Sequence, residues 1–177
     1  MVLEMDMQEP RLDKVTLNVG AGAARERLQS AKDLLERITG HKAVLTKAKD
    51  RNPTWKLRKG DTVGVKVTLR GKDAAEVLKK SLEAVDYSVP AKSFDRAGNV
   101  AFGVREYIDF PGMKYDPKIG MMGFDVCVSL AKPGARIARR RIARRSVPPK
   151  QRVRPEEARA FMEKNFKAQV VTPESAE

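Results

Sequence analysis

Apolar and polar residues alternate along four stretches of this sequence, with the period of two that is typical of a half-buried β-strand. These stretches are residues 13–19, 62–69, 99–105 and 123–130. In the first of them, Val15, Leu17 and Val19 share one face, while Thr16 and Asn18 share the other. A shorter run at 43–48 is a fifth candidate strand. Each strand is therefore expected to bury one face and expose the other.

Three other stretches change to the helical period, over residues 24–39, over 73–85 and after Pro155. Gly40 follows the first, as is common after a helix C-terminus. Asp73 and Glu76 have the spacing of a capping box, which predicts that the second helix begins at Asp73. The apolar stripes are formed by Leu28, Ala31, Leu35 and Ile38, by Ala75, Leu78, Leu82 and Val85, and by Ala158, Phe161, Met162 and Phe166.

The order of these elements is strand, helix, strand, strand, helix, strand, strand, followed by the last helix. This order predicts an α+β fold in which helices cover one face of a largely antiparallel sheet. The opposite face is then expected to carry Thr16, Asn18, Lys66 and Thr68. Residues 171–177 have the composition of a frayed tail.

Positive charge is concentrated in one segment of the chain. The 177 residues include 36 Lys and Arg against 23 Asp and Glu, a net charge of +13. Residues 132–154 contribute ten of these cations and no acid, which leaves an excess of only three elsewhere. Such a surplus favours a polyanionic partner, most often nucleic acid. We therefore divide the chain into an RNA-binding α+β domain (1–131), an Arg-rich extension (132–154), and a terminal helix and tail that dock on the same domain (155–177).

Several classes of protein are disfavoured by composition. No apolar run approaches the length that spans a bilayer, and the acidic N-terminus is unlike a secretory signal, so no membrane partner is expected. Cys127 is the only cysteine, which excludes an internal disulfide and suits the reducing cytoplasm; its position among apolar residues predicts a buried side chain. His41 is the only histidine, so no metal site is expected. No pairing of nucleophile and base is evident, and an enzyme is not predicted.

The glycine-rich stretch at 20–25 resembles the loop that binds dinucleotides, which has the pattern G-x-G-x-x-G/A. Arg25 stands where that pattern has a third small residue, and no acid ends the next strand to hold a ribose. We therefore interpret Gly20 and Gly22 as a tight strand-to-helix turn that requires no cofactor. A nucleotide-binding enzyme that uses this loop stays as an unfavoured alternative. Free amides at the helix N-terminus are also suited to an RNA phosphate.

Three surfaces have the chemistry to bind RNA, and the first of them is suited to DNA as well. The first is the Arg-rich extension, in which Arg136, Arg139, Arg140 and Arg144 share one face if the segment is helical. The second is the basic loop 47–59, whose cations surround the only tryptophan, Trp55, a side chain suited either to stacking on a base or to packing in the core. The third is the polar face of the sheet.

Several blocks of the sequence, taken in order, resemble a known family. They are KVTLNVGAG, TGHKAVLTKAK, GVKVTLRG, KSFDRAGNVAFGVRE, FPGMKYDPKIGMMGFDV and ARRSVPPKQRV. In this combination they are similar to the universal family of large-subunit ribosomal proteins that bind 5S rRNA, the fifth protein of that subunit in the universal naming. The extension after Lys132 resembles the archaeal and eukaryotic branch, since bacterial members lack it.

The resemblance implies a function and a set of site residues. Members bind 5S rRNA, help to seat it in the central protuberance beside large-subunit rRNA and other large-subunit proteins, reach P-site tRNA through a basic loop, and bridge to a protein of the small-subunit head. The family's RNA-contacting Asn and Thr fall on Asn18 and Thr68, and a family Gln falls on His41. The chain is therefore expected to act on the cytoplasmic ribosome. The alternative is an RNA chaperone or regulator outside the ribosome.

Three groups of contacts are predicted from the resemblance, the polar sheet face and the basic segments together. Expected contacts with 5S rRNA are Arg11, Thr16, Asn18, His41, Thr46, Lys47, Lys66, Thr68 and Arg70. Expected tRNA-binding residues are Lys49, Arg51, Asn52 and Trp55. Expected contacts with rRNA phosphates are Arg136, Arg139, Arg140, Arg141, Arg144 and Arg145.

Overall fold

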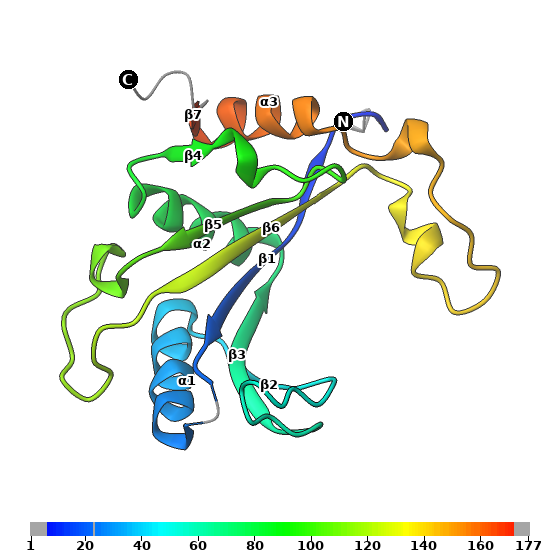
Figure 1. Cartoon of the computed structure of the whole chain (residues 1–177). Coiled ribbons are helices and arrows are strands. Elements are labelled where there is room, and N and C mark those ends of the chain that lie inside the picture. The colour runs from blue at the N-terminus through cyan, green and yellow to red at the C-terminus, as the bar shows by residue number, and fades with distance from the viewer. Residues whose placement is uncertain (1–6, 23, 172–177) are drawn as a thin grey trace.

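A five-stranded antiparallel sheet forms the centre of the protein. The computed structural model describes residues 7–22 and 24–171. The strands are β1 (Arg11–Gly20), β2 (Val44–Lys47), β3 (Thr62–Leu69), β5 (Val100–Val104) and β6 (Phe124–Ala131), in the spatial order β2-β3-β1-β6-β5. Every neighbouring pair is antiparallel (Figure 1). The predicted fold class is confirmed, and the parallel pairing of a dinucleotide-binding domain is absent from this central sheet.

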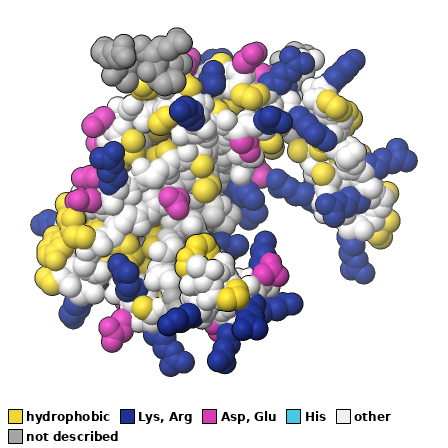
Figure 2. All heavy atoms as spheres, in the orientation of Figure 1, with side chains coloured by type: hydrophobic (Ala, Val, Ile, Leu, Met, Phe, Trp, Pro, Cys, Tyr) yellow, Lys and Arg dark blue, Asp and Glu magenta, His cyan; other side chains and the backbone are white. Residues whose placement is uncertain are grey.

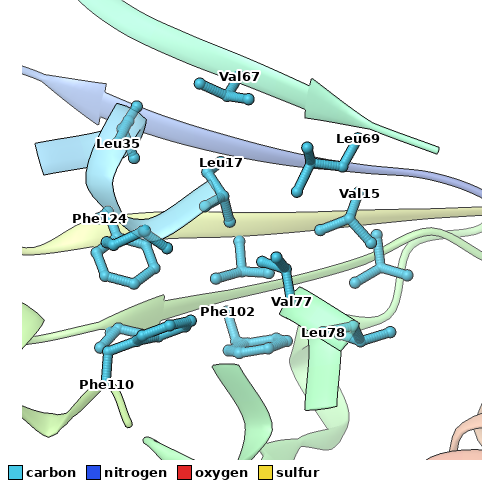
Figure 3. Close-up of a cluster of buried hydrophobic side chains, with 14 of the residues drawn as sticks. Val15, Leu17, Leu35, Val67, Leu69, Val77, Leu78, Phe102, Phe110 and Phe124 are labelled. Atoms are coloured by element: carbon cyan, nitrogen blue, oxygen red, sulfur yellow. The ribbon is translucent and has the colours of Figure 1, made fainter. Parts of the chain in front are cut away.

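The apolar face of the sheet is covered by two helices, α1 (Arg25–Thr39) and α2 (Gly71–Glu83). Figure 3 shows Leu17 and Val15 of β1 lying in one cluster with Leu35 of α1 and with Leu78 of α2. All four of these side chains have no exposed surface. Because the helices cover only one face of the sheet, the apolar positions of each strand are buried and the polar positions lie on the uncovered face.

The helix termini follow from local backbone geometry. Gly40 caps α1 in the left-handed conformation, as expected. The second helix begins at Gly71, with Arg70 as its N-cap, rather than at Asp73. Gly71 has φ +66°, a value that lets the chain turn from β3 into α2 without a connecting loop. The predicted capping box is therefore wrong, because the helix has already started when the chain reaches Asp73.

A second, smaller sheet has no signal in the sequence pattern. Strands β4 (Ser88–Pro90) and β7 (Gln169–Val171) pair in parallel, and the helix α3 (Pro155–Phe166) precedes β7. Val171, which the composition places in a frayed tail, belongs to β7; the rest of that tail lies outside the described residues. Ala158, Met162 and Phe166 of α3 are buried in the same apolar cluster as the central sheet. Short 3-10 turns at 91–93, 107–109, 135–138 and 149–151 complete the fold.

The described part of the chain contains no helix long and apolar enough to cross a membrane.

The glycine loop between β1 and α1 is a backbone turn. The amide groups of Ala21 and Gly22 both donate to the carbonyl oxygen of Val63, at 3.2 and 3.0 Å. Gly22 has φ +69°, whereas Gly20 has an ordinary φ, and a Cβ would meet nothing at either position. Because the loop's own strand pairing uses these two amides, they are not available to a phosphate.

This difference in backbone conformation predicts different effects of alanine at Gly22 and at Gly20. We expect Gly22→Ala to lower the free energy of unfolding by about 1–2 kcal/mol, because alanine is strained in the left-handed conformation. Gly20→Ala should change it by less than about 0.5 kcal/mol. Urea denaturation of the two variants measures the difference. Equal losses would contradict the assignment of the turn to Gly22 alone.

Candidate nucleic-acid interface

The uncovered face of the central sheet is lined by polar and small side chains. The register places Thr16 of β1 between Thr68 of β3 and Cys127 of β6. Two residues further on, Asn18 lies between Lys66 and Asp125. We call this surface the open sheet face and define it by Lys14, Thr16, Asn18, Val44, Thr46, Gly64, Lys66, Thr68, Ala101, Gly103, Asp125, Cys127 and Ser129. Val44, opposite Lys66 on the edge strand, is an exposed apolar member of this face.

The open sheet face is flat as well as polar. Lys66, Thr68 and Asp125 are exposed, and Thr16 and Asn18 in the central strand are half-buried only by their neighbours. Gly64, Ala101, Gly103 and Ser129 add little or no side-chain height. Such a surface allows a bulky ligand to come close to the hydrogen-bonding groups of the central strands.

The predicted 5S rRNA contacts divide into two groups in the structure. Thr16, Asn18, Thr46, Lys66 and Thr68 share the open sheet face. The other four lie on its perimeter. Arg11 is at the start of β1, Lys47 at the end of β2, Arg70 just after β3, and His41 in the connection from α1 to β2.

His41 has a partner within the chain. Its Nε2 lies 3.1 Å from Oδ2 of Asp73, and both side chains are exposed. This contact joins the C-terminal end of α1 to the first turn of α2. His41 is thereby held at the edge of the site, so an RNA group that reached it would share the imidazole with Asp73.

Among the members of the open sheet face, Cys127 was misplaced and Asp125 was missed by sequence reasoning. Cys127 is half-buried on this face rather than inside the core. Burial, and then the neighbouring charge of Asp125, raise the pKa of its thiol above the ordinary value. Asp125 supplies an acceptor oxygen beside Asn18. The alternation Val126–Val128 around Cys127 was the available signal for both, since residues flanking a buried position face outwards.

The loop between β2 and β3 is an ordered basic hairpin. Asn52 and Leu57 exchange two backbone hydrogen bonds of 3.0 and 2.9 Å, and the Asn52 side chain accepts from the amide of Thr54 at 3.1 Å. Trp55 at the tip is 72% exposed, so it does not pack in the core. The loop's cations are Lys47, Lys49, Arg51, Lys56, Arg58 and Lys59.

The Arg-rich extension forms a looped arm, not a helix. Its helical structure is limited to two short 3-10 turns, at 135–138 and 149–151. Ala143 has φ +53°, a left-handed value that interrupts a right-handed helix within the arginine stretch, and Pro148 and Pro149 follow it. The predicted single face of Arg136, Arg139, Arg140 and Arg144 is therefore wrong. We call residues 133–152 the arm (Figure 1, right).

The base of the arm is fastened to the fold at three points. The ammonium group of Lys132, which is 7% exposed, donates to Glu157 in the first turn of α3 at 2.8 Å. Nε2 of Gln151 donates to the carbonyl oxygens of Pro133 and Met7, at 2.9 and 3.0 Å. Arg139 donates to both carboxylate oxygens of Asp13, at 2.6 and 3.2 Å, and this bond lowers the pKa of Asp13.

Five other arginines of the arm have no partner among the described residues. Arg139 is paired with Asp13. The side chains of the other five expected phosphate contacts are exposed, and they donate to no acceptor among the described residues. Figure 2 shows Lys and Arg gathered on the arm at the right and around the β2–β3 loop at the bottom. The five are Arg136, Arg140, Arg141, Arg144 and Arg145.

Within the described ranges, no group of three or more His, Cys, Asp or Glu side chains is placed to hold a metal ion.

Comparison with known proteins agrees with this chemistry. Residues 6–58 match the family model "Ribosomal protein L5", and residues 62–167 match the model of the C-terminus of the same ribosomal family. The chain belongs to the ribosomal protein L5 family. It is therefore a structural ribosomal protein of the large subunit, for which ribosomal RNA and ribosomal proteins are the implied partners.

Similar proteins come from archaea. "Large ribosomal subunit protein uL5" of Sulfurisphaera tokodaii is 49% identical over 166 residues, which cover 93% of this chain and 94% of that protein. The protein of the same name from Thermoplasma acidophilum is 49% identical, with 93% and 98% covered. That of Methanococcus vannielii is 46% identical, with 93% of each chain covered. The resemblance to the archaeal type of this family is thereby confirmed.

The ion pair between buried Lys132 and partly exposed Glu157 at the base of the arm predicts a pH-dependent stability. The hydrogen bond from Lys132 holds the pKa of Glu157 below its ordinary value of 4.5. We expect Glu157→Gln to lower the free energy of unfolding by about 1–3 kcal/mol at neutral pH, because buried Lys132 loses its counter-ion. A lowered pKa stabilises the fold only while the carboxylate is ionised, so this difference should vanish as the pH falls below 4.5 and through the lowered value.

Urea unfolding across this pH range measures the difference, with Glu156→Gln as the matched control. Glu156 lies in the same first turn of α3 but is exposed. A loss of the same size in the control would show that the helix dipole, rather than the pair with Lys132, is responsible.

Proposed function

We propose that this protein binds 5S rRNA through the open sheet face and helps to hold it in the central protuberance of the large ribosomal subunit. The observation that carries the proposal is the uncovered set of hydroxyl, amide and ammonium groups that three neighbouring strands hold in register. Folded RNA is recognised largely by its shape and by contacts to phosphates and 2′-hydroxyl groups. A rigid, flat and polar platform is suited to such contacts.

The individual groups of the open sheet face have complementary roles. The hydroxyls of Thr16 and Thr68 and the carboxamide of Asn18 both donate and accept hydrogen bonds, as a 2′-hydroxyl does. Lys66, beside Asn18, offers a cation to a phosphate. Asp125, on the other side of Asn18, accepts hydrogen bonds and repels phosphate. This order of charge along one row of the sheet favours one orientation of the RNA backbone over its reverse.

Loss of the central polar groups should reduce specific binding more than general affinity for RNA. We expect Asn18→Ala and Thr68→Ala each to weaken binding to 5S rRNA by about threefold to tenfold, the value of one net hydrogen bond. Binding to a duplex RNA of random sequence should change less, because it depends on charge. Filter binding at fixed salt measures both affinities.

Gln29→Ala is the matched control for these two variants. Gln29 is an exposed polar residue of α1, on the side of the sheet that the helices cover, and its side chain donates to Asp33 four residues away. It should leave both affinities unchanged. Equal losses on 5S rRNA and on random duplex in Asn18→Ala and Thr68→Ala would contradict the role of the open sheet face.

We further propose that the basic β2–β3 hairpin contacts P-site tRNA. Its tip carries an exposed indole surrounded by six cations, and the backbone pairing of Asn52 with Leu57 holds this tip in shape. An aromatic plane offers stacking to a base or sugar, while the cations bind the backbone.

Trp55 is the only tryptophan, so its fluorescence reports directly on this contact. We expect tRNA to quench the emission of the isolated chain as the indole stacks. Trp55→Ala should weaken tRNA binding by about 1–3 kcal/mol, and Trp55→Phe should restore part of the loss because a phenyl ring also stacks. Binding of tRNA without any change in emission would contradict the assignment.

The contact with a small-subunit head protein requires a surface of another kind, and we propose the segment 105–122 between β5 and β6 for it. Ile108, Tyr115 and Met121 are exposed there, at 36%, 55% and 52%, and Figure 2 shows hydrophobic side chains gathered at this end of the molecule. An exposed apolar group is typical of contact with protein rather than with phosphate.

This segment is held firmly to the helical layer. The buried hydroxyl of Tyr107 accepts from the amide of Asp116 at 2.8 Å, and Arg37 of α1 donates to the Asp116 carboxylate at 2.7 Å. Ser30 of α1 also donates to the carbonyl oxygen of Lys118 at 3.3 Å. A segment fixed in this way presents its apolar side chains with little loss of conformational entropy on binding.

A further inference from the structure

The arm borders an open hollow whose apolar floor has no role in the contacts proposed above. It has a volume of about 660 Å³ and lies between the end of β6, the two limbs of the arm and the residues that return to α3. We call it the arm hollow. Its apolar floor and walls are formed by Leu130, Ala135, Ala138, Val147 and Val153.

Positive charge surrounds this apolar floor. Arg139, Arg144, Arg145 and Arg152 line the arm hollow, and no acidic side chain does. Arg144 and Arg145 have no acceptor among the described residues. Ser146 adds a hydroxyl, and Oε1 of Gln151 accepts no hydrogen bond from the described residues, since only Nε2 of this side chain fastens the base of the arm. The lining thus combines an apolar surface, a few convergent polar groups and several guanidinium planes.

The walls are held in place without any ligand. The amide of Arg145 donates to the carbonyl oxygen of Ile137 at 3.3 Å, which joins the two limbs of the arm. The guanidinium of Arg152 donates to the carbonyl oxygen of Val147 at 3.2 Å, and Arg139 is fixed by Asp13. A hollow that is preorganised in this way binds a ligand with a smaller cost in conformational entropy.

The size and charge of the hollow restrict what it can hold. Its volume falls within the range of about 300–1,000 Å³ that is usual for sites of small organic ligands, whereas a nucleic-acid duplex is too wide to enter. A single unstacked nucleotide has both an apolar planar face and a negative charge. RNA-binding proteins commonly bind such bases against guanidinium planes and read their edges with a few polar groups.

We propose that the arm hollow receives one unstacked nucleotide of ribosomal RNA, with its base against Leu130, Ala138 and Val147 and its phosphate at Arg144 and Arg145. This inference rests on the proposed binding of rRNA. It assigns to the arm a recognition role in addition to neutralising charge. The arm thereby distinguishes RNA that can present a flipped base from RNA that is fully paired.

Filling the hollow without changing its charge tests this proposal. Ala138→Leu places a larger apolar side chain in the hollow, and Ala160→Leu makes the same change at an exposed position of α3 outside it. We expect Ala138→Leu to weaken binding to 5S rRNA or to protein-free large-subunit rRNA by about tenfold. Its salt dependence should be unchanged, whereas Arg144→Gln should lower the slope by about 0.7–0.9. Ala160→Leu should match the wild type.

A titration of the free chain tests the hollow without large RNA. The four nucleoside 5′-monophosphates should shift the methyl resonances of Leu130, Val147 and Val153, and Ala138→Leu should abolish the shift. Inorganic phosphate alone should not move these methyl groups. Equal shifts with inorganic phosphate would show that the hollow binds any anion. The absence of a shift with all four nucleotides would show that the hollow binds no nucleotide. Either result overturns the proposal, and so does an rRNA affinity of Ala138→Leu equal to that of the wild type.

These outcomes are separable from failure of the proposed function. If the wild-type chain ignored 5S rRNA and large-subunit rRNA, the ribosomal role of the site would be contradicted. If it bound them and only Ala138→Leu lacked an effect, the arm hollow alone would be rejected. Asn18→Ala should reduce 5S rRNA binding and leave the mononucleotide shifts unchanged, because it lies on the open sheet face.

Discussion

The structure depends on the one-sided burial of its central sheet. Two helices cover the face formed by residues such as Val15, Leu17 and Val67, and these side chains are almost completely removed from water. The hydrophobic effect thereby determines which way every strand faces, since a slip of one residue would exchange the two faces. The same constraint brings Thr16, Asn18, Lys66 and Thr68 together on the opposite side. The open sheet face is thus a consequence of how the core is buried.

Positive charge is distributed according to a different rule. The open sheet face carries few cations and one acid, whereas the β2–β3 hairpin and the arm carry many of the exposed lysines and arginines. Charges on projecting segments attract RNA over distance and tolerate variation in its shape. Hydrogen-bonding groups on a rigid sheet require close fit. Charged groups, which act over distance, therefore lie on the projecting segments, and hydrogen-bonding groups, which act only at contact, lie on the sheet.

The arm shows how a basic segment can be organised by its few non-basic contacts. Lys132 and Gln151 fasten its ends, and Asp13 holds Arg139 from the central sheet. Five arginines are thereby left without acceptors among the described residues, on a loop with a defined base. A segment of the same composition without these fastenings would lose more entropy on meeting RNA.

The sequence pattern alone predicts much of this architecture. Period-two alternation located four of the five central strands, a shorter run located the fifth, the helical stripes located three helices, and their order predicted a largely antiparallel sheet with one open face. Local patterns failed where distant residues decide the outcome. Strands β4 and β7 have three residues each and are separated by most of the C-terminal half, so no periodicity marks their pairing. Likewise, four arginines at helical spacing did not form a helix, because Ala143 takes a left-handed φ and the contacts with Asp13 and Ile137 hold the segment as a loop.

The candidate site divides in the same way. Alternation alone determined that Thr16, Asn18, Lys66 and Thr68 face away from the core, because a strand has only two faces and one of them is apolar. Only the folded chain decided that Thr16 lies between Thr68 and Cys127, that Trp55 is exposed, and that Arg139 is paired with Asp13. Those facts depend on registers and on ion pairs between residues as far apart as Asp13 and Arg139, which no local pattern encodes.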